Sequence, residues 1–237
     1  MRILVVNDDS IHSTGIALLA QCAMELGEVW VVAPAQQCSA MSHKISIHNP
    51  LLVEKVEFPV PVAAAYQVTG TPADCVKVAI HQIMEYKPDY VFSGINDGYN
   101  VGFDIAYSGT LGAAFEAVMN GIPAIAFSAP GGSLLDVAQA HLTAVAKELI
   151  ERGQGIGEVW NVNFPSANCK GILWERKIAP MQFYSENYMK EQLSQNIVRL
   201  TSQGNPMTLD DHAPFGTDIE AVLNGYISIG KVKSAVL

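Results

Sequence analysis

Two adjacent carboxylates, Asp8 and Asp9, directly follow the apolar run 2–6 near the start of the chain. Neighbouring carboxylates at the end of a buried strand repel each other, and a bound cation relieves that repulsion. Their hard oxygen atoms suit Mg²⁺ or Mn²⁺. Asp also caps helices at such positions, so helix capping stays open as the alternative. We interpret Asp8 and Asp9 as candidate metal ligands and candidate catalytic groups.

Two polar residues elsewhere in the chain are candidates to complete a metal site. Asn96 lies in the segment Ser-Gly-Ile-Asn-Asp-Gly at 93–98. An Asn among glycines is usually a turn residue, but its amide oxygen can bind a hard metal and its amino group can donate to phosphate. Ser39 lies in a polar segment with Ser42 and His43, and by itself it has the character of an ordinary loop residue.

The segment Ser108-Gly109-Thr110 precedes a run with helical apolar spacing. Small hydroxyl residues and a glycine at a helix start leave main-chain N–H groups free, and such groups bind anions. An ordinary helix cap is the commoner use of these residues. The segment is therefore a candidate phosphate-binding site that can also cap its helix.

Strands and helices that alternate along the chain must position these side chains. Buried strands are predicted at residues 2–6, 29–33, 90–92, 124–127 and 159–162, the last of which we expect to end the main sheet. Amphipathic helices are predicted at residues 14–26, from 71 onward, at 108–120 and at 135–149. Continuous apolar strands that alternate with helices indicate an α/β fold with a Rossmann-like, doubly wound, mostly parallel sheet.

The alternation divides the chain into two expected parts. Residues 1–165 are expected to form the catalytic core, interrupted at 34–65 by a polar loop with a hairpin around 50–58. Residues 166–237 lose the alternation, and we expect a β-rich C-terminal extension that holds an oligomerisation arm and a final strand.

Ligands of open α/β sheets bind at the carboxyl ends of the strands, near the point where the strand order reverses. This rule selects four loops, at residues 7–13, 34–48, 93–108 and 128–134. The first three contain the carboxylate pair, Ser39 and Asn96, and the third ends at Ser108. The candidates are therefore expected to meet at one edge of the sheet.

The composition excludes several classes of protein. The 237 residues are 49% hydrophobic and carry a net charge of −9, which argues against a nucleic-acid duplex as partner but not against a small phosphate ester. No apolar stretch approaches the ~18 residues that a membrane span needs. The start of the chain does not resemble a signal peptide, and the four cysteines are widely spaced, so we expect reduced thiols in a cytoplasmic protein.

The ordered series of motifs resembles the survival protein E (SurE) family of 5′/3′-nucleotidases. The matching stretches begin with Ile3 to Asp9, Val32-Ala33-Pro34, Ser39, His43, and Gly70 to Cys75. They continue with Ser93 to Asn96, Gly98, Asn100, Gly102, Tyr107 to Thr110, Asn161 to Pro165, Thr217-Asp218, and Gly225 to Ile229. Each stretch alone is weak, whereas their order along nearly the whole chain is specific.

This resemblance implies a Rossmann-like domain with one divalent cation per subunit, Mg²⁺ or Mn²⁺, and no organic cofactor. The implied metal ligands are Asp8, Asp9, Ser39 and Asn96. The implied phosphate contacts are Asn96, Ser108, Gly109 and Thr110. The family hydrolyses nucleoside 5′- and 3′-monophosphates, often shortens polyphosphate, and forms homodimers or homotetramers that exchange C-terminal segments.

The chain departs from the family pattern at three places. The loop after Pro34 usually carries acidic and basic residues, but here it reads Ala35-Gln36-Gln37-Cys38. Ala40 stands where a glycine usually follows the serine, and Gly230-Lys231 stands where the family often continues with Thr-Pro. These departures concern the base preference and the subunit interface more than the reaction.

We hypothesise metal-assisted hydrolysis without a covalent intermediate, in which Asp8 or Asp9 accepts the proton of the attacking water. A receiver domain is one alternative, but it needs a phospho-acceptor Asp where Asn96 stands. A haloacid-dehalogenase-type phosphatase is another, but it needs Asp-x-Asp rather than Asp8-Asp9-Ser10. A nucleotide-binding protein without catalysis is the third, and turnover separates it from an enzyme.

Overall fold

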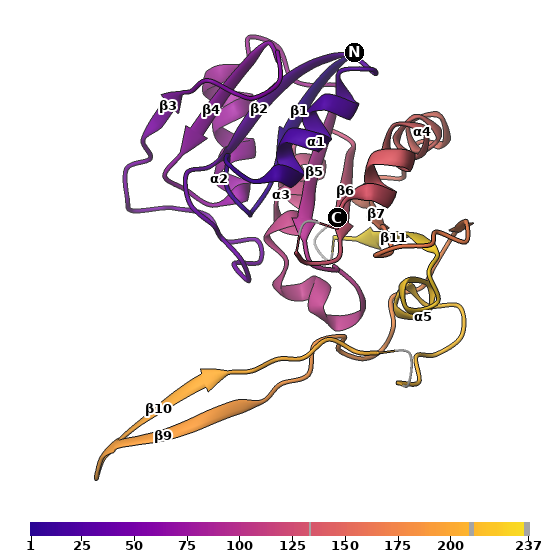
Figure 1. The fold of residues 1–237 in the computed structure, drawn as a ribbon. Coiled ribbons are helices and arrows are strands. Elements are labelled where there is room, and N and C mark those ends of the chain that lie inside the picture. Colours follow the sequence, from indigo (N-terminus) through magenta and orange to yellow (C-terminus); the bar gives the residue numbers. More distant parts are fainter. Residues whose placement is uncertain (133, 209–210, 235–237) are drawn as a thin grey trace.

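One mixed sheet of nine strands forms the centre of the protein in a computed structural model that describes residues 1–132, 134–208 and 211–234 (Figure 1). Six strands run parallel in the order β4-β2-β1-β5-β6-β7. Their bounds are β1 Arg2–Val6, β2 Glu28–Pro34, β4 Ala64–Val68, β5 Tyr90–Asp97, β6 Ala124–Ala129 and β7 Glu158–Asn163. This order reverses between β1 and β5, as in a Rossmann fold. It confirms the predicted α/β architecture.

Helices cover both faces of this sheet (Figure 1). Helices α1 (Thr14–Ala23) and α4 (Asp136–Arg152) pack on one face, and α2 (Pro72–Val78) and α3 (Gly109–Met119) pack on the other. Successive residues of β1 alternate between these layers, because side chains of a strand point to opposite faces. Ile3 and Val5 therefore join the α1 and α4 layer, while Leu4 and Val6 join the α2 and α3 layer.

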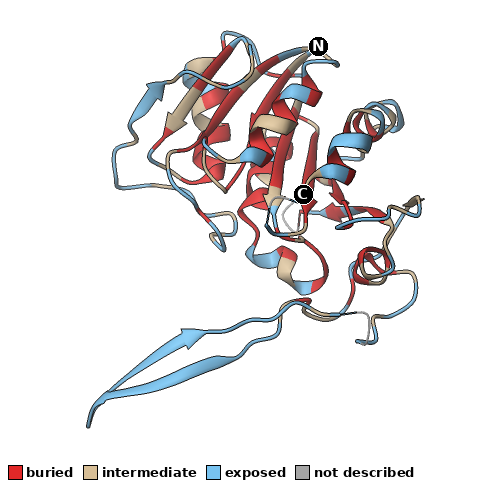
Figure 2. Ribbon diagram, in the orientation of Figure 1, coloured by how far each residue is buried: buried red, intermediate tan, exposed pale blue. Residues whose placement is uncertain are grey.

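The strands that carry the candidate site are buried on both faces (Figure 2). Four of the five residues of β1 are buried, which explains why this strand reads as a continuous apolar run and not as an alternating pattern. The sheet therefore gives the loops at its carboxyl edge a rigid support.

Side-chain caps start the predicted helices where the sequence signals them. Ser13 caps α1, and Thr71 and Asp74 form a capping box at the start of α2 with Pro72 in its first turn. One predicted length needs correction. Helix α1 ends at Ala23 and not at residue 26, and the helix that begins with α2 continues as a π-helical turn, Ala79–Ile83.

The sequence predicted that β7 would be the last strand of the main sheet. The structure shows instead that the sheet continues beyond β7. Strand β11 (Ile227–Lys233) pairs antiparallel with β7, and the short β8 (Ile172–Leu173) pairs parallel with β11. The exposed edge of β7 would leave a row of main-chain N–H and C=O groups without partners. The C-terminal chain satisfies that edge.

The polar excursion after β2 adds a strand at the opposite edge. Strand β3 (Val53–Lys55) pairs antiparallel with β4. The hairpin therefore spans 53–68, and the region 50–58 that was predicted as a hairpin supplies only its first strand. The segment 35–52 between β2 and β3 contains Ser39 and lies largely outside regular structure.

A two-stranded antiparallel ribbon extends away from the core (Figure 1). It consists of β9 (Tyr188–Ser194) and β10 (Ile197–Ser202), and every residue of both strands is exposed (Figure 2). Helix α5 (Asp218–Leu223) then leads the chain back to β11. Within the described ranges, no helix is both long and apolar enough to cross a membrane.

Candidate active site

The turn after β1 is held by the side chain of Asn7. This residue is fully buried, and its amide nitrogen donates to the main-chain oxygen of Ser10 at 2.9 Å and to Oγ of Ser13 at 2.8 Å. Ser13 also caps α1. The turn and the helix start therefore form one hydrogen-bonded unit, which fixes the positions of Asp8 and Asp9.

The carboxylate of Asp8 lies against the first turn of α3. Its Oδ1 accepts a hydrogen bond of 2.7 Å from the Thr110 hydroxyl. Gly109 packs so close that a Cβ atom there would lie 3.0 Å from Asp8 Oδ2. A side chain at position 109 would displace the carboxylate, so the glycine allows this contact between β1 and α3.

Asp9 receives hydrogen bonds from two other loops. Its Oδ2 accepts from the main-chain N–H of Asp97 at 2.9 Å, and its Oδ1 accepts from the Gln37 amide at 3.4 Å. The residue is half-buried. The loops after β1, β2 and β5 therefore meet at Asp9, as the strand-end rule predicted.

The two carboxylates have an electrostatic environment that favours a cation. Burial, and then the charge of Asp9, raises the pKa of Asp8 to about 7, while hydrogen bonds from Thr110 oppose the shift. Burial, and then the charge of Asp97, raises the pKa of Asp9, against hydrogen bonds from Asp97 and Gln37. No cationic side chain contributes to either shift among the described residues. Hard oxygen atoms with uncompensated negative charge fit a divalent metal ion.

The two remaining candidate metal ligands border this acidic pair. Asn96 is half-buried at the end of β5, next to the N–H that binds Asp9, and its amide nitrogen donates to the Gly98 main-chain oxygen at 2.7 Å. That bond leaves the amide oxygen to act as a ligand. Ser39 is exposed and follows Cys38, whose N–H donates to the main-chain oxygen of Asp8 at 2.7 Å.

The candidate phosphate-binding segment lies at the start of α3. The Ser108 hydroxyl accepts the N–H of Leu111 at 3.1 Å, so it caps the helix. The Thr110 hydroxyl binds Asp8. The Thr110 O–H is therefore committed to Asp8, whereas the Ser108 hydroxyl keeps its own O–H to donate to an anion, together with main-chain N–H groups of the first helical turn.

Asn7, Gln37 and Asp97 belong to the site, although the sequence argument assigned them no role. Gln37 and Asp97 lie in two of the loops that the strand-end rule selected, so loop membership was the available signal. The contact of Thr110 with Asp8 had no such signal, because 102 positions separate the two residues.

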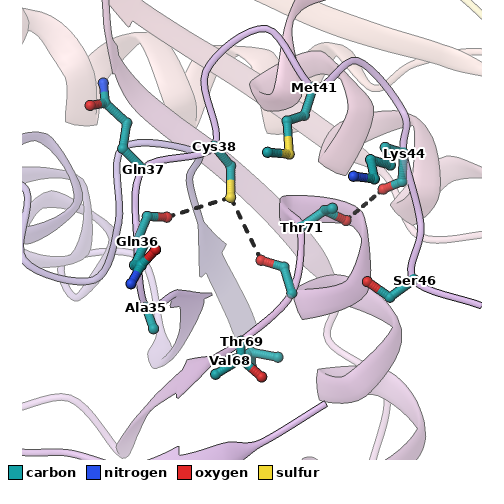
Figure 3. A pocket seen from close by; sticks show the side chains of 11 residues that line it. Ala35, Gln36, Gln37, Cys38, Met41, Lys44, Ser46, Val68, Thr69 and Thr71 are labelled. Carbon is teal, nitrogen blue, oxygen red and sulfur yellow. Dashed lines mark hydrogen bonds between the residues drawn. The ribbon is translucent and has the colours of Figure 1, made fainter. Parts of the chain in front are cut away.

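Two cavities share Gln37, whose amide donates to Asp9. One, of about 270 Å³, is lined by residues that include Asp9, Gln37 and Asp97. The second, of about 330 Å³, lies between the loop after β2 and the end of β4, and Cys38 is at its centre (Figure 3). The site is therefore a concave surface with room for a small ligand.

The chain is similar to known proteins over most of its length. A family model described as survival protein SurE matches residues 3–183. The chain is 38% identical over 235 residues to "5′-nucleotidase SurE" of Pelotomaculum thermopropionicum, covering 98% of this chain and 89% of that protein. It is 40% identical over 244 residues to "5′-nucleotidase SurE 1" of Thermus thermophilus, covering 98% and 91%.

A solved structure shows the same fold. The crystal structure of the SurE protein from Aquifex aeolicus superposes with a TM-score of 0.83 at 36% sequence identity, covering 98% of this chain and 93% of that chain. The family model and these relatives each span most of the chain. The protein therefore belongs to the SurE family.

Proposed function

We propose that this protein is a divalent-metal-dependent phosphomonoesterase that hydrolyses nucleoside monophosphates to nucleoside and phosphate. The relatives from Pelotomaculum and Thermus are named 5′-nucleotidases. The site supports the same chemistry, because its carboxylates, amide and hydroxyl groups lie at the carboxyl edge of a Rossmann-like sheet.

The observation that carries this proposal is the burial of Asp8 next to Asp9. Asp8 is 3% exposed, and its pKa is raised to about 7 because burial and the neighbouring carboxylate both disfavour its charge. A carboxylate buried beside a second, half-buried one is costly unless a cation compensates their charge. Metal binding explains why two carboxylates lie side by side at this position, whereas helix capping does not.

Four side chains are proposed to hold the metal: Asp8, Asp9, Asn96 through its amide oxygen, and Ser39. Either Mg²⁺ or Mn²⁺ suits these hard ligands. When bound, such an ion acidifies water and offsets charge on the transferring phosphoryl group. Thr110 and Asn7 keep the carboxylates in place through their hydrogen bonds.

The residues of the chain then have distinct roles in the reaction. Asp8 or Asp9 accepts the proton of the water that attacks phosphorus. The Ser108 hydroxyl, the main-chain N–H groups of Gly109 and Thr110, and the Asn96 side chain hold the phosphate oxygens. The ester P–O bond breaks, the proton that the carboxylate took from water passes to the leaving oxygen, and the nucleoside leaves as an alcohol without a covalent enzyme intermediate.

The proposal also covers the range of substrates and the cellular compartment of the protein. We propose that 5′- and 3′-monophosphates are both substrates and that polyphosphate is shortened, as the family resemblance implies. All four cysteines are free thiols, which supports a reducing compartment such as the cytoplasm.

We further propose a homodimer or homotetramer in which the β9–β10 ribbon reaches a second subunit. The ribbon is exposed at every position and still carries large apolar side chains. These side chains are Tyr188, Met189, Leu193, Ile197, Val198 and Leu200. An isolated two-stranded hairpin is at best marginally stable in water, so a partner surface would stabilise it.

The test is phosphate release from nucleoside 5′- and 3′-monophosphates with Mn²⁺, Mg²⁺ or a chelator. We compare wild type with Asp9→Asn and with Asp136→Asn, which removes one exposed carboxylate from the first turn of α4. We expect metal-dependent release by wild type and Asp136→Asn, and a loss of at least about a hundredfold in Asp9→Asn.

Two results would overturn the proposal. Absence of release with every metal, by a correctly folded protein, would favour a nucleotide-binding protein without turnover. Isolation of a phospho-aspartate at Asp8 or Asp9 would replace direct attack by water with a covalent mechanism.

A further inference from the structure

The cavity between the loop after β2 and the end of β4 has an apolar floor and a polar rim (Figure 3). We call it the Cys38 cavity. Cys38 and Met41 supply apolar surface, and Gln36, Lys44 and Thr69 supply polar groups at the rim. Its volume of about 330 Å³ is in the range of small-molecule sites, and the mixture of apolar and polar walls is typical of them.

The cavity is joined to the acidic pair through one short loop. The main-chain N–H of Cys38 donates to the main-chain oxygen of Asp8 at 2.7 Å. The adjacent Gln37 also lines the cavity, and its amide lies 3.4 Å from Asp9. A phosphate ester bound at Asp8 and Asp9 would therefore have this cavity next to it.

Two polar side chains of the rim are available to a ligand. Within the described part of the chain, neither the Gln36 amide nor the Lys44 ammonium group makes a side-chain hydrogen bond or an ion pair. Lys44 extends from the loop toward the cavity beside Met41 and Thr71 (Figure 3). In a chain with a net charge of −9, an unpaired ammonium group at a cavity rim favours a ligand with hydrogen-bond acceptors.

These groups match the edge of a purine. An amide side chain pairs with the adjacent donor and acceptor of adenine, and a lysine pairs with the acceptors N7 and O6 of guanine. Met41 adds a polarisable thioether, which makes favourable contacts with aromatic rings. We propose that the Cys38 cavity binds the purine base of the substrate, with Gln36 and Lys44 facing its edge. This inference rests on the proposed nucleotidase function and names the part of the substrate that the cavity recognises.

A larger cavity, which borders Asp97, is the competing place for the base. It has about 660 Å³ and is lined by residues that include Asp97, Tyr99, Tyr184 and Met207. Its aromatic groups are already engaged, because Tyr99 and Tyr184 both pack edge-on against Phe183 and the Tyr184 hydroxyl accepts the N–H of Tyr99 at 3.1 Å. The Cys38 cavity therefore offers the freer recognition groups.

The test compares a nucleotide with an ester that lacks the base. We measure kcat/KM for AMP, GMP and ribose 5-phosphate in wild type, in Met41→Trp, which fills the Cys38 cavity, and in Met207→Trp, which fills the competing cavity. We expect Met41→Trp to lower kcat/KM for AMP and GMP at least about tenfold more than for ribose 5-phosphate. Met207→Trp is expected to leave that ratio at the wild-type value.

A second variant tests the assigned edge contact. Lys44→Met removes the ammonium group and keeps the length of the side chain. We expect it to raise KM for GMP more than for AMP, because guanine presents two acceptors to a lysine. Unfolding temperatures within about 3 °C of wild type show that the variants are folded.

The results distinguish a failure of this inference from a failure of the proposed nucleotidase function. Equal losses for AMP and ribose 5-phosphate in Met41→Trp would overturn it, and a selective loss in Met207→Trp would move the base to the other cavity. If wild type hydrolyses none of the three esters, the proposed function fails by itself. Calorimetric titration of AMP into wild type and Met41→Trp then tests the cavity without turnover, and equal affinities would overturn the inference.

Discussion

The hydroxyl group of Thr110 donates a hydrogen bond of 2.7 Å to Oδ1 of Asp8. The donor lies in the first turn of α3 and the acceptor follows β1, so the bond joins the two elements on either side of the proposed phosphate position. It also stabilises the charged form of a carboxylate whose pKa burial raises. Thr110 is therefore proposed as a positioning residue for a metal ligand.

Replacing Thr110 tests this role. We expect Thr110→Val, which has nearly the same shape, to lower kcat/KM by roughly tenfold or more, because a hydrogen bond to a charged group contributes about 1.5–3 kcal/mol. Thr110→Ser keeps the hydroxyl and should stay within about threefold of wild type. The half-saturating Mn²⁺ concentration should rise in the valine variant alone. Equal kinetics for the two variants would show that the hydrogen bond does not matter.

The stability of the metal-free protein should depend on pH through Asp8. Its pKa is raised from 3.8 to about 7 in the folded protein, so the folded state binds a proton that the unfolded chain releases near pH 4. The stabilisation from this proton is fully present below about pH 4. It is lost as the pH rises to 7, by at most about 1.4 kcal/mol per pH unit.

Thermal unfolding in a chelator at pH 5, 6 and 7 measures this effect, with Asp8→Asn as the variant that cannot titrate. We expect the unfolding temperature of wild type to fall relative to that of Asp8→Asn as the pH rises. Addition of Mn²⁺ at pH 7 should raise the unfolding temperature of wild type and not that of the variant. Parallel pH profiles for the two proteins would contradict the assigned pKa.

Glu116 connects the loop of Ser39 to the two helices on the same face of the sheet. It is buried in α3, and it accepts from His43 at 3.0 Å and from Asn120 at 2.9 Å, with Lys77 of α2 at 3.5 Å. We expect Glu116→Gln to lose about 1–3 kcal/mol of stability at pH 7, because a charged acceptor is replaced by a neutral one. Glu148→Gln, in an exposed pair with Arg152, should change stability by less than about 1 kcal/mol.

The pH dependence of that loss has a definite sign. The hydrogen bond from His43, with support from Lys77 and Asn120, lowers the pKa of Glu116 below its ordinary value of 4.5. Its stabilising effect is therefore present above about pH 4.5 and is lost as the pH falls through the lowered pKa. Urea unfolding should show the two proteins converging below pH 4.5. A difference that stays constant as the pH falls from 7 to about 3 would mean that packing, and not charge, accounts for the loss.

The β9–β10 ribbon provides a test of the proposed assembly. Side chains two residues apart on a strand point to the same face. Val198 and Leu200 of β10 therefore share one face of the ribbon, opposite Gln192 and Lys190 of β9. We expect Leu200→Asp to shift the protein toward monomers in light scattering, since a charge would be buried at the interface. Gln139→Asp adds the same charge at an exposed position of α4, outside the ribbon, and should leave the assembly intact. A monomeric wild type at micromolar concentration would contradict the proposal.

The sequence by itself determined the core architecture and the edge at which the site lies. Continuous apolar runs such as 2–6 and 124–127 predict buried parallel strands because their period is a local property of the backbone. The strand-end rule then placed Asp8, Asp9 and Asn96 at one edge, and the structure confirms that their loops meet there. The ordered motifs identified the family before any geometry was known.

Only the tertiary structure decided how distant segments pair. The sequence contains no signal that Thr110 binds Asp8, because the bond depends on how closely α3 packs on β1 and on the missing side chain of Gly109. It also did not indicate that β11 would cover the edge of β7. The main-chain N–H and C=O groups that pair strands are nearly the same in every sequence, so they do not specify which strand will be the partner. The partner is decided by which edge of the sheet remains unpaired when the other strands have formed. Local sequence patterns therefore determine the helices and strands, whereas the contacts between them are decided only when the whole chain has folded.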